Sequence, residues 1–332
     1  MNQCTKLTHL YFDSTHFLTN LSPYLMRAKT VYQTSQTIIP PRVILFVLFL
    51  AMLWGGNAVS LKIGLQEFSP FASAGLRFTI GLALIASWAL ANGISIKPQR
   101  HELLRLFLTA LLFITQIAAL NVGADFTRAG RTAVMTNTYP LFVALIAHFV
   151  VPGDHMTRRK ALGLVFAFGG VCFVFRDNFI GGTGEFLIGD LLTLLGGFLL
   201  GLLIVVTNRL IQHINTYCVL VSQMVIGVPA FFTLSAIFEG RAGYGFSFPA
   251  LFAVLYQGAG IAGFCFVAWT LLLKDYPPSR LSVFFFTTPL WGILLSNLLI
   301  GEPITVGLTI GAALVALGIY TINRSPKRQL VH

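Results

Sequence analysis

The stretch AGRTAVMTNTYPLFVAL, residues 129–145, is echoed later in the chain by PSRLSVFFFTTPLWGIL, residues 278–294. In each copy an arginine is followed, nine residues later, by a Pro-Leu pair inside an apolar run. A proline inside a helix removes one backbone hydrogen bond and bends the helix. We therefore predict helix kinks at Pro140 and Pro289, and the repeated pattern predicts a duplicated fold.

The composition places this chain in a membrane. Of 332 residues, 56% are hydrophobic and only 10% are charged, and the mean hydropathy is +0.80. Soluble proteins carry about 25% charged residues, so the chain is predicted to be an all-α integral membrane protein. Its net charge of +11 lies in the tails and between apolar runs, as is typical of membrane topology signals rather than of a nucleic-acid surface.

Ten apolar runs are predicted to cross the hydrocarbon core, which is roughly 30 Å thick and takes about 20 helical residues. They are Val43–Lys62, Phe71–Ala91, Leu103–Gly123, Thr132–Pro152, Ala161–Phe175, Phe186–Thr207, Tyr217–Phe238, Phe248–Leu273, Ser282–Ile300 and Ile304–Ile322. The links between them are too short for a soluble domain.

The ends of the chain are polar. Residues 1–41 contain no apolar run of the kind a signal peptide needs, so we expect a disordered cytoplasmic tail. A true start at Met26 and a regulatory segment are the alternatives. Sixteen of the 22 Lys and Arg residues fall on the side of the N-terminus and five on the other. By the positive-inside rule, both termini, including the tail 323–332, are predicted to be cytoplasmic in a cell-membrane protein.

The echo is part of an internal repeat of two five-helix halves, 43–175 and 186–322. The matched pairs are Arg131 with Arg280 and Pro140 with Pro289 at an offset of 149, then Gly163 with Gly311 and Gly170 with Gly318 at 148; nearer the start of each half, Arg77 meets Gln223. Because each half holds an odd number of spans, the second must enter the membrane inverted. Inverted repeats are typical of transporters that open alternately to either side.

Several stretches carry a family resemblance. They are LWGGNAVSLKIGL (53–65), SPFASAGLRF (69–78), AGRTAVMTNTYPLFVALIAHFVVPGD (129–154), GDLLTLLGG (189–197), TTPLWGILLSNLLIGEPIT (287–305) and GAALVALGIY (311–320). In this order they resemble the EamA type of the ten-span drug/metabolite transporter superfamily, over about residues 43–322. The resemblance implies ten helices in two inverted halves around a central cavity, and export or exchange of small metabolites, often amino acids.

The sequence departs from the family pattern in two places. The fourth span ends in VPGD, where the family more often has a glycine–glutamate pair like Gly301-Glu302. The first span also lacks the embedded glutamate that small multidrug-resistance relatives use for proton exchange. The second departure argues against proton-coupled export of cationic drugs.

Polar and aromatic side chains within the apolar spans are the candidates for a substrate pathway. Trp54 and Asn57 are three residues apart and share a helix face; core packing is the alternative. Arg77 lies about 10 Å along its helix at 1.5 Å per residue. A cation at that depth needs a partner such as a substrate carboxylate; snorkelling, or a fixed pair with Asp125 or Asp190, is the alternative.

The fourth span supplies the best polar candidates, Asn137 and Tyr139, which flank the proline predicted to free the carbonyl of Thr136. Weaker candidates for the pathway are Gln116, Asn121 and Trp269. The GxxxG pairs Gly197–Gly201 and Gly307–Gly311 predict close helix packing, inside the bundle or at a dimer seam. The oligomeric state is thus monomer or homodimer.

We expect a secondary transporter of small polar metabolites, amino acids among them, that works by alternating access. The first alternative is an antiporter for sugar phosphates or nucleotide-sugars, and the second is a membrane sensor or scaffold without transport. The chain has no HExxH, GxSxG or phosphate-loop motif, and its four cysteines lack metal-ligand spacing. We therefore predict no enzyme activity, cofactor or metal, and expect only the substrate and the lipid bilayer as partners.

Overall fold

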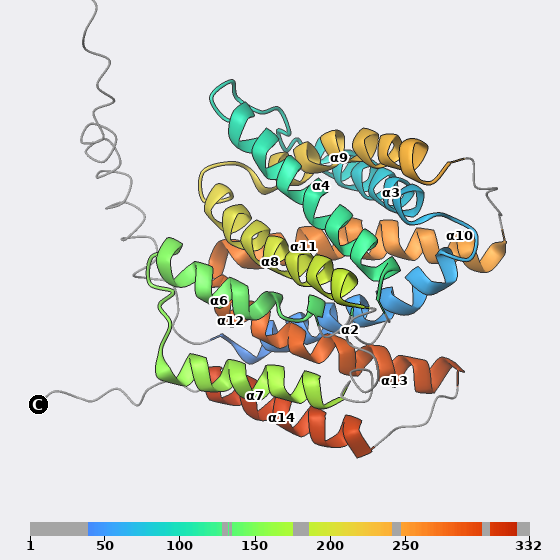
Figure 1. Ribbon diagram of the computed structural model, residues 1–332. Coiled ribbons are helices and arrows are strands. Elements are labelled where there is room, and N and C mark those ends of the chain that lie inside the picture. The colour runs from blue at the N-terminus through green and yellow to red at the C-terminus, as the bar shows by residue number, and fades with distance from the viewer. Residues whose placement is uncertain are drawn as a thin grey trace, which may run out of the picture. The chain divides into compact units, whose positions relative to one another are not determined.

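A computed structural model describes residues 39–127, 132, 135–174, 186–240, 247–300 and 306–323, and the described residues form helices and no strands (Figure 1). The helices of the first part are α2 (Pro41–Gly64), α3 (Pro70–Ala91), α4 (Leu103–Asp125), α6 (Tyr139–Val150) and α7 (Arg158–Val174). Those of the second part are α8 (Leu187–Leu210), α9 (Thr216–Phe238), α10 (Phe248–Leu255), the π-helix η2 (Tyr256–Cys265), α11 (Phe266–Asp275), α12 (Pro278–Ser282), the 3₁₀ helix η3 (Val283–Thr287), α13 (Thr288–Ile300) and α14 (Val306–Asn323).

Five helices in the described part of the chain are long and apolar enough to cross a membrane. They are Pro70–Ala91, Leu103–Ala124, Leu187–Leu210, Thr216–Phe238 and the continuous Phe248–Asp275, which joins α10, η2 and α11. Shorter apolar helices cover Pro41–Asn57, Tyr139–Val150 and Ala313–Ile322. Large apolar side chains such as Phe149, Phe238 and Phe248 lie exposed on the outer surfaces of the helices, where a bilayer would cover them.

The predicted fourth span, Thr132–Pro152, is not one regular helix. The chain turns at Asn137 and Thr138, and α6 begins at Tyr139, with Pro140 in its first turn. A proline is well tolerated there because a first-turn amide has no partner within the helix. Pro140 thus marks a helix start after a break rather than a kink in a continuous helix.

Pro289 occupies the same place in the second copy, in the first turn of α13 and directly after η3. The carbonyl oxygen of Phe285, four residues before Pro289, is not left free, since the Thr288 amide donates to it across the end of η3. The carbonyl of Thr136 in the first copy lies beside α8, where a methyl group added at Gly197 would be 3.3 Å from it.

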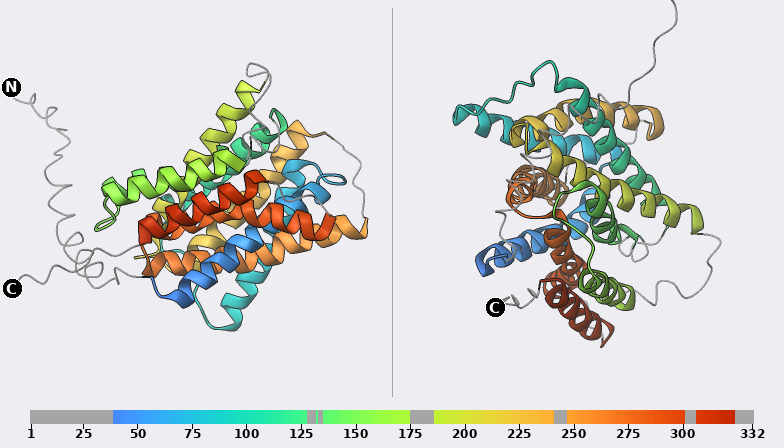
Figure 2. Two further views of the ribbon diagram at one scale, coloured as in Figure 1. Left: turned by 90° about the horizontal axis from the view of Figure 1, so that it is seen from below. Right: turned by 90° about the vertical axis from the view of Figure 1, so that its left-hand side faces the viewer.

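The helices pack in pairs that draw on both parts of the chain. α3 lies against α9, while α7 lies against α14 at the other side of the bundle (Figures 1 and 2). Between them, α2 packs on α13, and α8 packs on α6. An apolar core joins α3, α4 and α9 through three mutually contacting rings, Phe78, Phe113 and Phe231, with centroids 4.9–5.9 Å apart.

Glycines allow the closest of these contacts. A methyl group added at Gly55 of α2 would lie 2.8 Å from the Thr288 carbonyl oxygen and 2.8 Å from the Trp291 Cβ. At Gly201 of α8 it would lie 3.2 Å from the Tyr139 carbonyl oxygen and 2.8 Å from the Phe142 Cβ. The Gly197–Gly201 pair therefore packs inside the bundle, against the broken fourth helix.

The pair of α7 and α14 is also joined through glycines. A methyl group at Gly163, early in α7, would meet the Gly318 carbonyl oxygen at 2.7 Å, late in α14. One at Gly170, late in α7, would meet the Gly311 carbonyl oxygen at 2.7 Å, early in α14. The two helices therefore run antiparallel, with their backbones in direct contact.

Two carboxylates, half-buried Glu239 and buried Asp154, tie distant segments together. Glu239, which follows α9, accepts hydrogen bonds from Ser69 Oγ at 2.5 Å and from the Phe71 amide at 2.6 Å, so it caps the start of α3. Asp154, in the VPGD turn, is 1% exposed and accepts from the Lys160 ammonium and from the amide and hydroxyl of Ser279 at the start of α12. The residue that departs from the family pattern thus joins the two parts of the chain.

Candidate functional site

Three of the predicted pathway residues meet around one phenylalanine, Phe285 of η3. Its ring centroid lies 5.2 Å from that of Trp54 on α2, 4.7 Å from that of Trp269 on α11 and 6.3 Å from that of Tyr139 on α6. All three pairs are edge-to-face, the arrangement that aromatic quadrupoles favour. We call these four residues the aromatic cluster.

The aromatic cluster continues toward the predicted charged residue. Trp54 stacks on Phe266 with a centroid distance of 6.1 Å, and Phe266 is 5.9 Å from Phe78. The Arg77 guanidinium carbon lies 4.8 Å from the centroid of the Phe78 ring, a cation–π distance. A continuous aromatic wall thus leads from Arg77 to Tyr139.

Ten buried side-chain atoms have no hydrogen-bond partner in the described part of the chain, and five of them lie on α2, α3 and η2. They include Asn57 Oδ1 on α2, Ser73 Oγ and Arg77 Nε on α3, and both amide atoms of Gln257 on η2. A buried polar group left unpaired costs about 1–3 kcal/mol. Water or a ligand could supply the missing partners of these atoms.

The other residues predicted for the substrate pathway are not members of the aromatic cluster. Gln116 is buried on α4, and Asn121 of the same helix donates to the Pro70 carbonyl oxygen at 3.5 Å. Asn137 is buried in the turn directly before α6. Asp190, one of the partners considered for Arg77, accepts from Thr127 Oγ1 at 2.8 Å. The side chain of Asp125, the other, lies outside the described residues.

Sequence reasoning missed two residues of this site. Phe285 is one of three consecutive phenylalanines in an apolar run, so nothing in the pattern separates it from its neighbours. Gln257 carried a usable signal, since it is a lone amide within an apolar span and is followed closely by glycines 258, 260 and 263. Small residues around an isolated polar one in a span allow helices to approach it closely.

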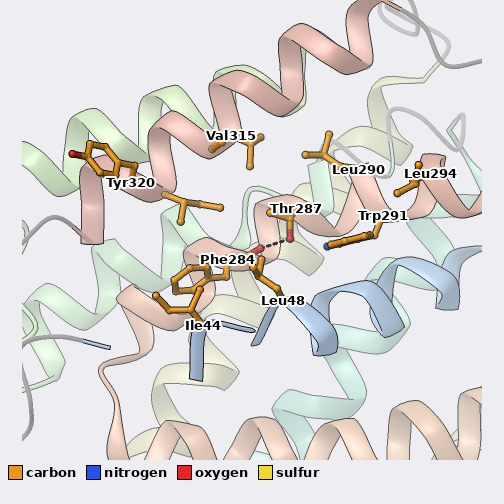
Figure 3. A pocket seen from close by; sticks show the side chains of 11 residues that line it. Ile44, Leu48, Phe284, Thr287, Leu290, Trp291, Leu294, Val315 and Tyr320 are labelled. Atoms are coloured by element: carbon orange, nitrogen blue, oxygen red, sulfur yellow. Dashed lines mark hydrogen bonds between the residues drawn. The ribbon is translucent and has the colours of Figure 1, made fainter. Parts of the chain in front are cut away.

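A pocket of about 510 Å³ lies elsewhere, between α2, η3, α13 and α14 (Figure 3). Ile44, Leu48, Leu290 and Val315 are among its walls, and the Thr287 hydroxyl there is engaged with the Phe284 carbonyl oxygen at 2.6 Å. None of the eight residues predicted for the pathway lines it. Its walls suit hydrocarbon rather than a polar solute, so we place the candidate site at the aromatic cluster and the unpaired polar atoms beside it.

Among the residues that the structure describes, no three His, Cys, Asp or Glu side chains gather in a way that could hold a metal ion. The candidate site is accordingly built from aromatic rings, amides and one guanidinium. Groups of this kind can bind and orient a small polar molecule.

The chain matches known proteins over most of its length. The EamA-like transporter family matches twice, at residues 41–176 and 187–324. An uncharacterized transporter of Bacillus subtilis, YoaV, is 26% identical over 84% of this chain and 96% of its own length. A probable amino-acid metabolite efflux pump of Escherichia coli is 25% identical over 82% of this chain and 92% of its own.

A solved crystal structure has the same fold, with a TM-score of 0.76 and 19% identity over 85% of this chain and 96% of that one. The apolar helices and the family match together indicate a multi-pass membrane transporter. With the family matched across both parts of the chain, the protein belongs to the EamA-like transporter family.

Proposed function

We propose that the protein is a secondary transporter that exports or exchanges small polar metabolites, amino acids among them, by alternating access. The observation that carries this proposal is that the aromatic cluster contains residues from both halves of the chain. Trp54 and Tyr139 come from the first family match, and Trp269 and Phe285 come from the second. A site shared between two halves changes its access when the halves move relative to each other.

The proposed halves are inverted, and the glycine contacts support this. A methyl group added at Gly55 would meet the carbonyl oxygen of residue 288, the Cβ of residue 291 and the amide nitrogen of residue 292. One added at Gly201 would meet the same three atoms of residues 139, 142 and 143, which lie 149 positions earlier. This is the offset of the sequence repeat. It supports a two-fold relation between the halves.

The antiparallel pair α7 and α14 supports the same relation. The sequence repeat matches Gly163 with Gly311 and Gly170 with Gly318. If each glycine is replaced by its match in the other half, the contact of Gly163 with Gly318 becomes the contact of Gly311 with Gly170. That is the second glycine contact between α7 and α14. A self-complementary contact of this kind is what a two-fold axis produces. Ten spans, with both termini cytoplasmic in the cell membrane, complete this proposal.

Arg77 is the basis for the proposed substrate class. Its Nε atom is buried and has no partner among the described residues, and a cation inside a membrane helix bundle is stabilised by an anionic group. An organic anion or the carboxylate of a zwitterion would supply one. The name of the Escherichia coli relative, an amino-acid metabolite efflux pump, agrees with this class. We propose no catalytic activity, and the partners are the substrate and the bilayer.

Flux into proteoliposomes across an amino-acid and metabolite panel, at several pH values, tests the proposal. Removing the guanidinium by Arg77→Ala should lower flux about tenfold or more, since hydrogen bonds to charged groups contribute about 1.5–3 kcal/mol. Tyr139→Phe should lower flux by a smaller factor, without loss of folding. Arg105→Ala, at an exposed arginine of α4, is the matched control.

Two results would count against the proposal. Folded wild-type protein that moves no compound of a wide panel would oppose transport itself. Unchanged kinetics in both site variants would leave transport intact but show that the site is wrongly assigned.

A further inference from the structure

Asp154 is a buried carboxylate with three hydrogen-bond donors around it. It accepts from the Lys160 ammonium, from the Ser279 hydroxyl and, at 3.1 Å, from the Ser279 amide. Lys160 and Ser279 are themselves buried, at 7% and 2% exposure. A charge removed from water is tolerated where it is paired and hydrogen-bonded, as this one is. We call these three residues the Asp154 network.

The Asp154 network joins the two halves at one end of the bundle. Asp154 and Lys160 belong to the first family match, and Ser279 belongs to the second. Arg158 and Arg159, which lie between Asp154 and Lys160 in the sequence, are exposed, so the network lies beneath a charged surface. We call this end of the bundle the Asp154 face. In the proposed topology it is cytoplasmic.

The network and the aromatic cluster lie at opposite ends of one seam between the halves. α6 begins at Tyr139, whose ring contacts Phe285, and ends at Val150, four residues before Asp154. α12 begins beside Asp154 and leads into η3, which carries Phe285. Because α6 packs on both α12 and η3 (Figure 1), the two segments run antiparallel. The seam from the candidate site to the Asp154 face is therefore closed.

The second copy of the sequence repeat does not carry the same donors. At the repeat offsets of 148 and 149, the matches are Glu302 for Asp154, Leu308 for Lys160 and Gly130 for Ser279. The carboxylate is kept, but leucine and glycine have no side-chain donor. This comparison is one of sequence, since Glu302 and Gly130 lie outside the described residues. The two copies thus differ in the groups that could hold the halves together.

We propose that the Asp154 network is a latch that holds the transporter closed at the Asp154 face. When one half rocks against the other, the seam between α6 and α12 must part, and the bonds from Ser279 to Asp154 must break. The bond from Lys160 stays within the first half and keeps the carboxylate neutralised. Because the second copy lacks these side-chain donors, the conformational equilibrium favours closure at the Asp154 face. This inference rests on the proposed alternating access and adds the residues that bias it.

The test measures how often the candidate site opens to each face. A single cysteine replaces Asn57 in a chain whose four native cysteines are replaced, and an impermeant thiol reagent is applied to either face of oriented vesicles. Adding Ser279→Ala to this parent removes the hydroxyl bond across the seam. It should raise the modification rate from the Asp154 face about tenfold, the effect of one hydrogen bond to a charged group.

The rate from the opposite face separates a latch from a general loosening of the fold. A two-state equilibrium that gains one conformation loses the other, so Ser279→Ala should leave that rate unchanged or lower it. A variant that only loosens the packing would raise both rates. Asp154→Asn is less suitable, because it leaves the buried Lys160 ammonium without its counter-charge and can prevent folding.

α12 supplies the matched control. Ser282 lies three residues after Ser279 in the same short helix, is 0% exposed, and its Oγ has no hydrogen-bond partner in the described part of the chain. Ser282→Ala removes the same atom from the same helix and should keep the parent's rates from both faces. Ser279→Thr, which retains a hydroxyl, should stay closer to the parent than Ser279→Ala does.

The outcomes separate the latch from the proposed function. If the parent transports a substrate but its cysteine is modified from one face only, or from neither, alternating access fails and the latch fails with it. If the parent is modified from both faces and Ser279→Ala keeps its rates, alternating access stands and the latch is wrong. Equal rises from both faces in Ser279→Ala, or the same change in Ser282→Ala, would also overturn the latch.

Discussion

At the scale of single residues, the candidate site contains Phe285 and Gln257, two side chains whose surroundings only the fold determines. Phe285 joins rings from three other helical segments. The polar and aromatic candidates Trp54, Tyr139 and Trp269 could be predicted because such residues are unusual in an apolar span. The phenylalanine between them could not, because a long-range contact leaves no mark on an apolar sequence.

Glu239 is a residue whose structural role gives a direct prediction. Its carboxylate accepts from Ser69 Oγ and from the amides of Phe71 and Ala72 at the start of α3. Glu239→Gln removes the charge that favours a helix N-terminus and should destabilise the protein by about 1–2 kcal/mol, within the range of helix caps. Thermal unfolding in detergent checks this. Glu67→Gln, in the turn before α3, should change the midpoint little, and equal shifts in both variants would contradict the capping role.

At the scale of elements, the ends of most helices were predictable from apolar length and from prolines and loop residues. α3 was predicted as Phe71–Ala91 and runs from Pro70 to Ala91, and α9 was predicted as Tyr217–Phe238 and runs from Thr216 to Phe238. The break before α6 and the π-helix η2 were not predictable. At the first, Gly197 of α8 lies against the Thr138 hydroxyl and the Thr136 carbonyl oxygen. The second contacts α2 and α3, and both sets of contacts join segments that are far apart in the sequence.

The contact between α7 and α14 allows a prediction from two adjacent glycines. A methyl group at Gly170 would meet the Gly311 carbonyl oxygen at 2.7 Å, whereas one at Gly169 has nothing within 4 Å. Gly170→Ala should therefore lower the unfolding temperature, because the two backbones must separate. Gly169→Ala should leave it unchanged or raise it, since alanine is favoured over glycine in a helix by about 1 kcal/mol. Equal effects of the two substitutions would show that α7 and α14 do not pack as described.

At the scale of the whole molecule, composition alone indicated a membrane protein and the internal repeat indicated two halves. The family match agrees with a membrane transporter, whereas ten spans and inverted halves remain predictions. Asp154 shows why the contact between the two parts of the chain could not be predicted from the sequence. It departs from the family pattern at its own position, yet its partner Ser279 is 125 residues away, and only the fold brings them together.

The proposed alternating access requires that one site, shared between the halves, opens to each side of the membrane in turn. It is tested by a single cysteine in place of Asn57, in a chain whose four native cysteines are replaced, with impermeant thiol reagents applied to either face of oriented vesicles. We predict modification from both faces, slowed on each by a substrate identified in the flux panel. Modification from one face only, or from neither, in a variant that still transports that substrate would contradict alternating access.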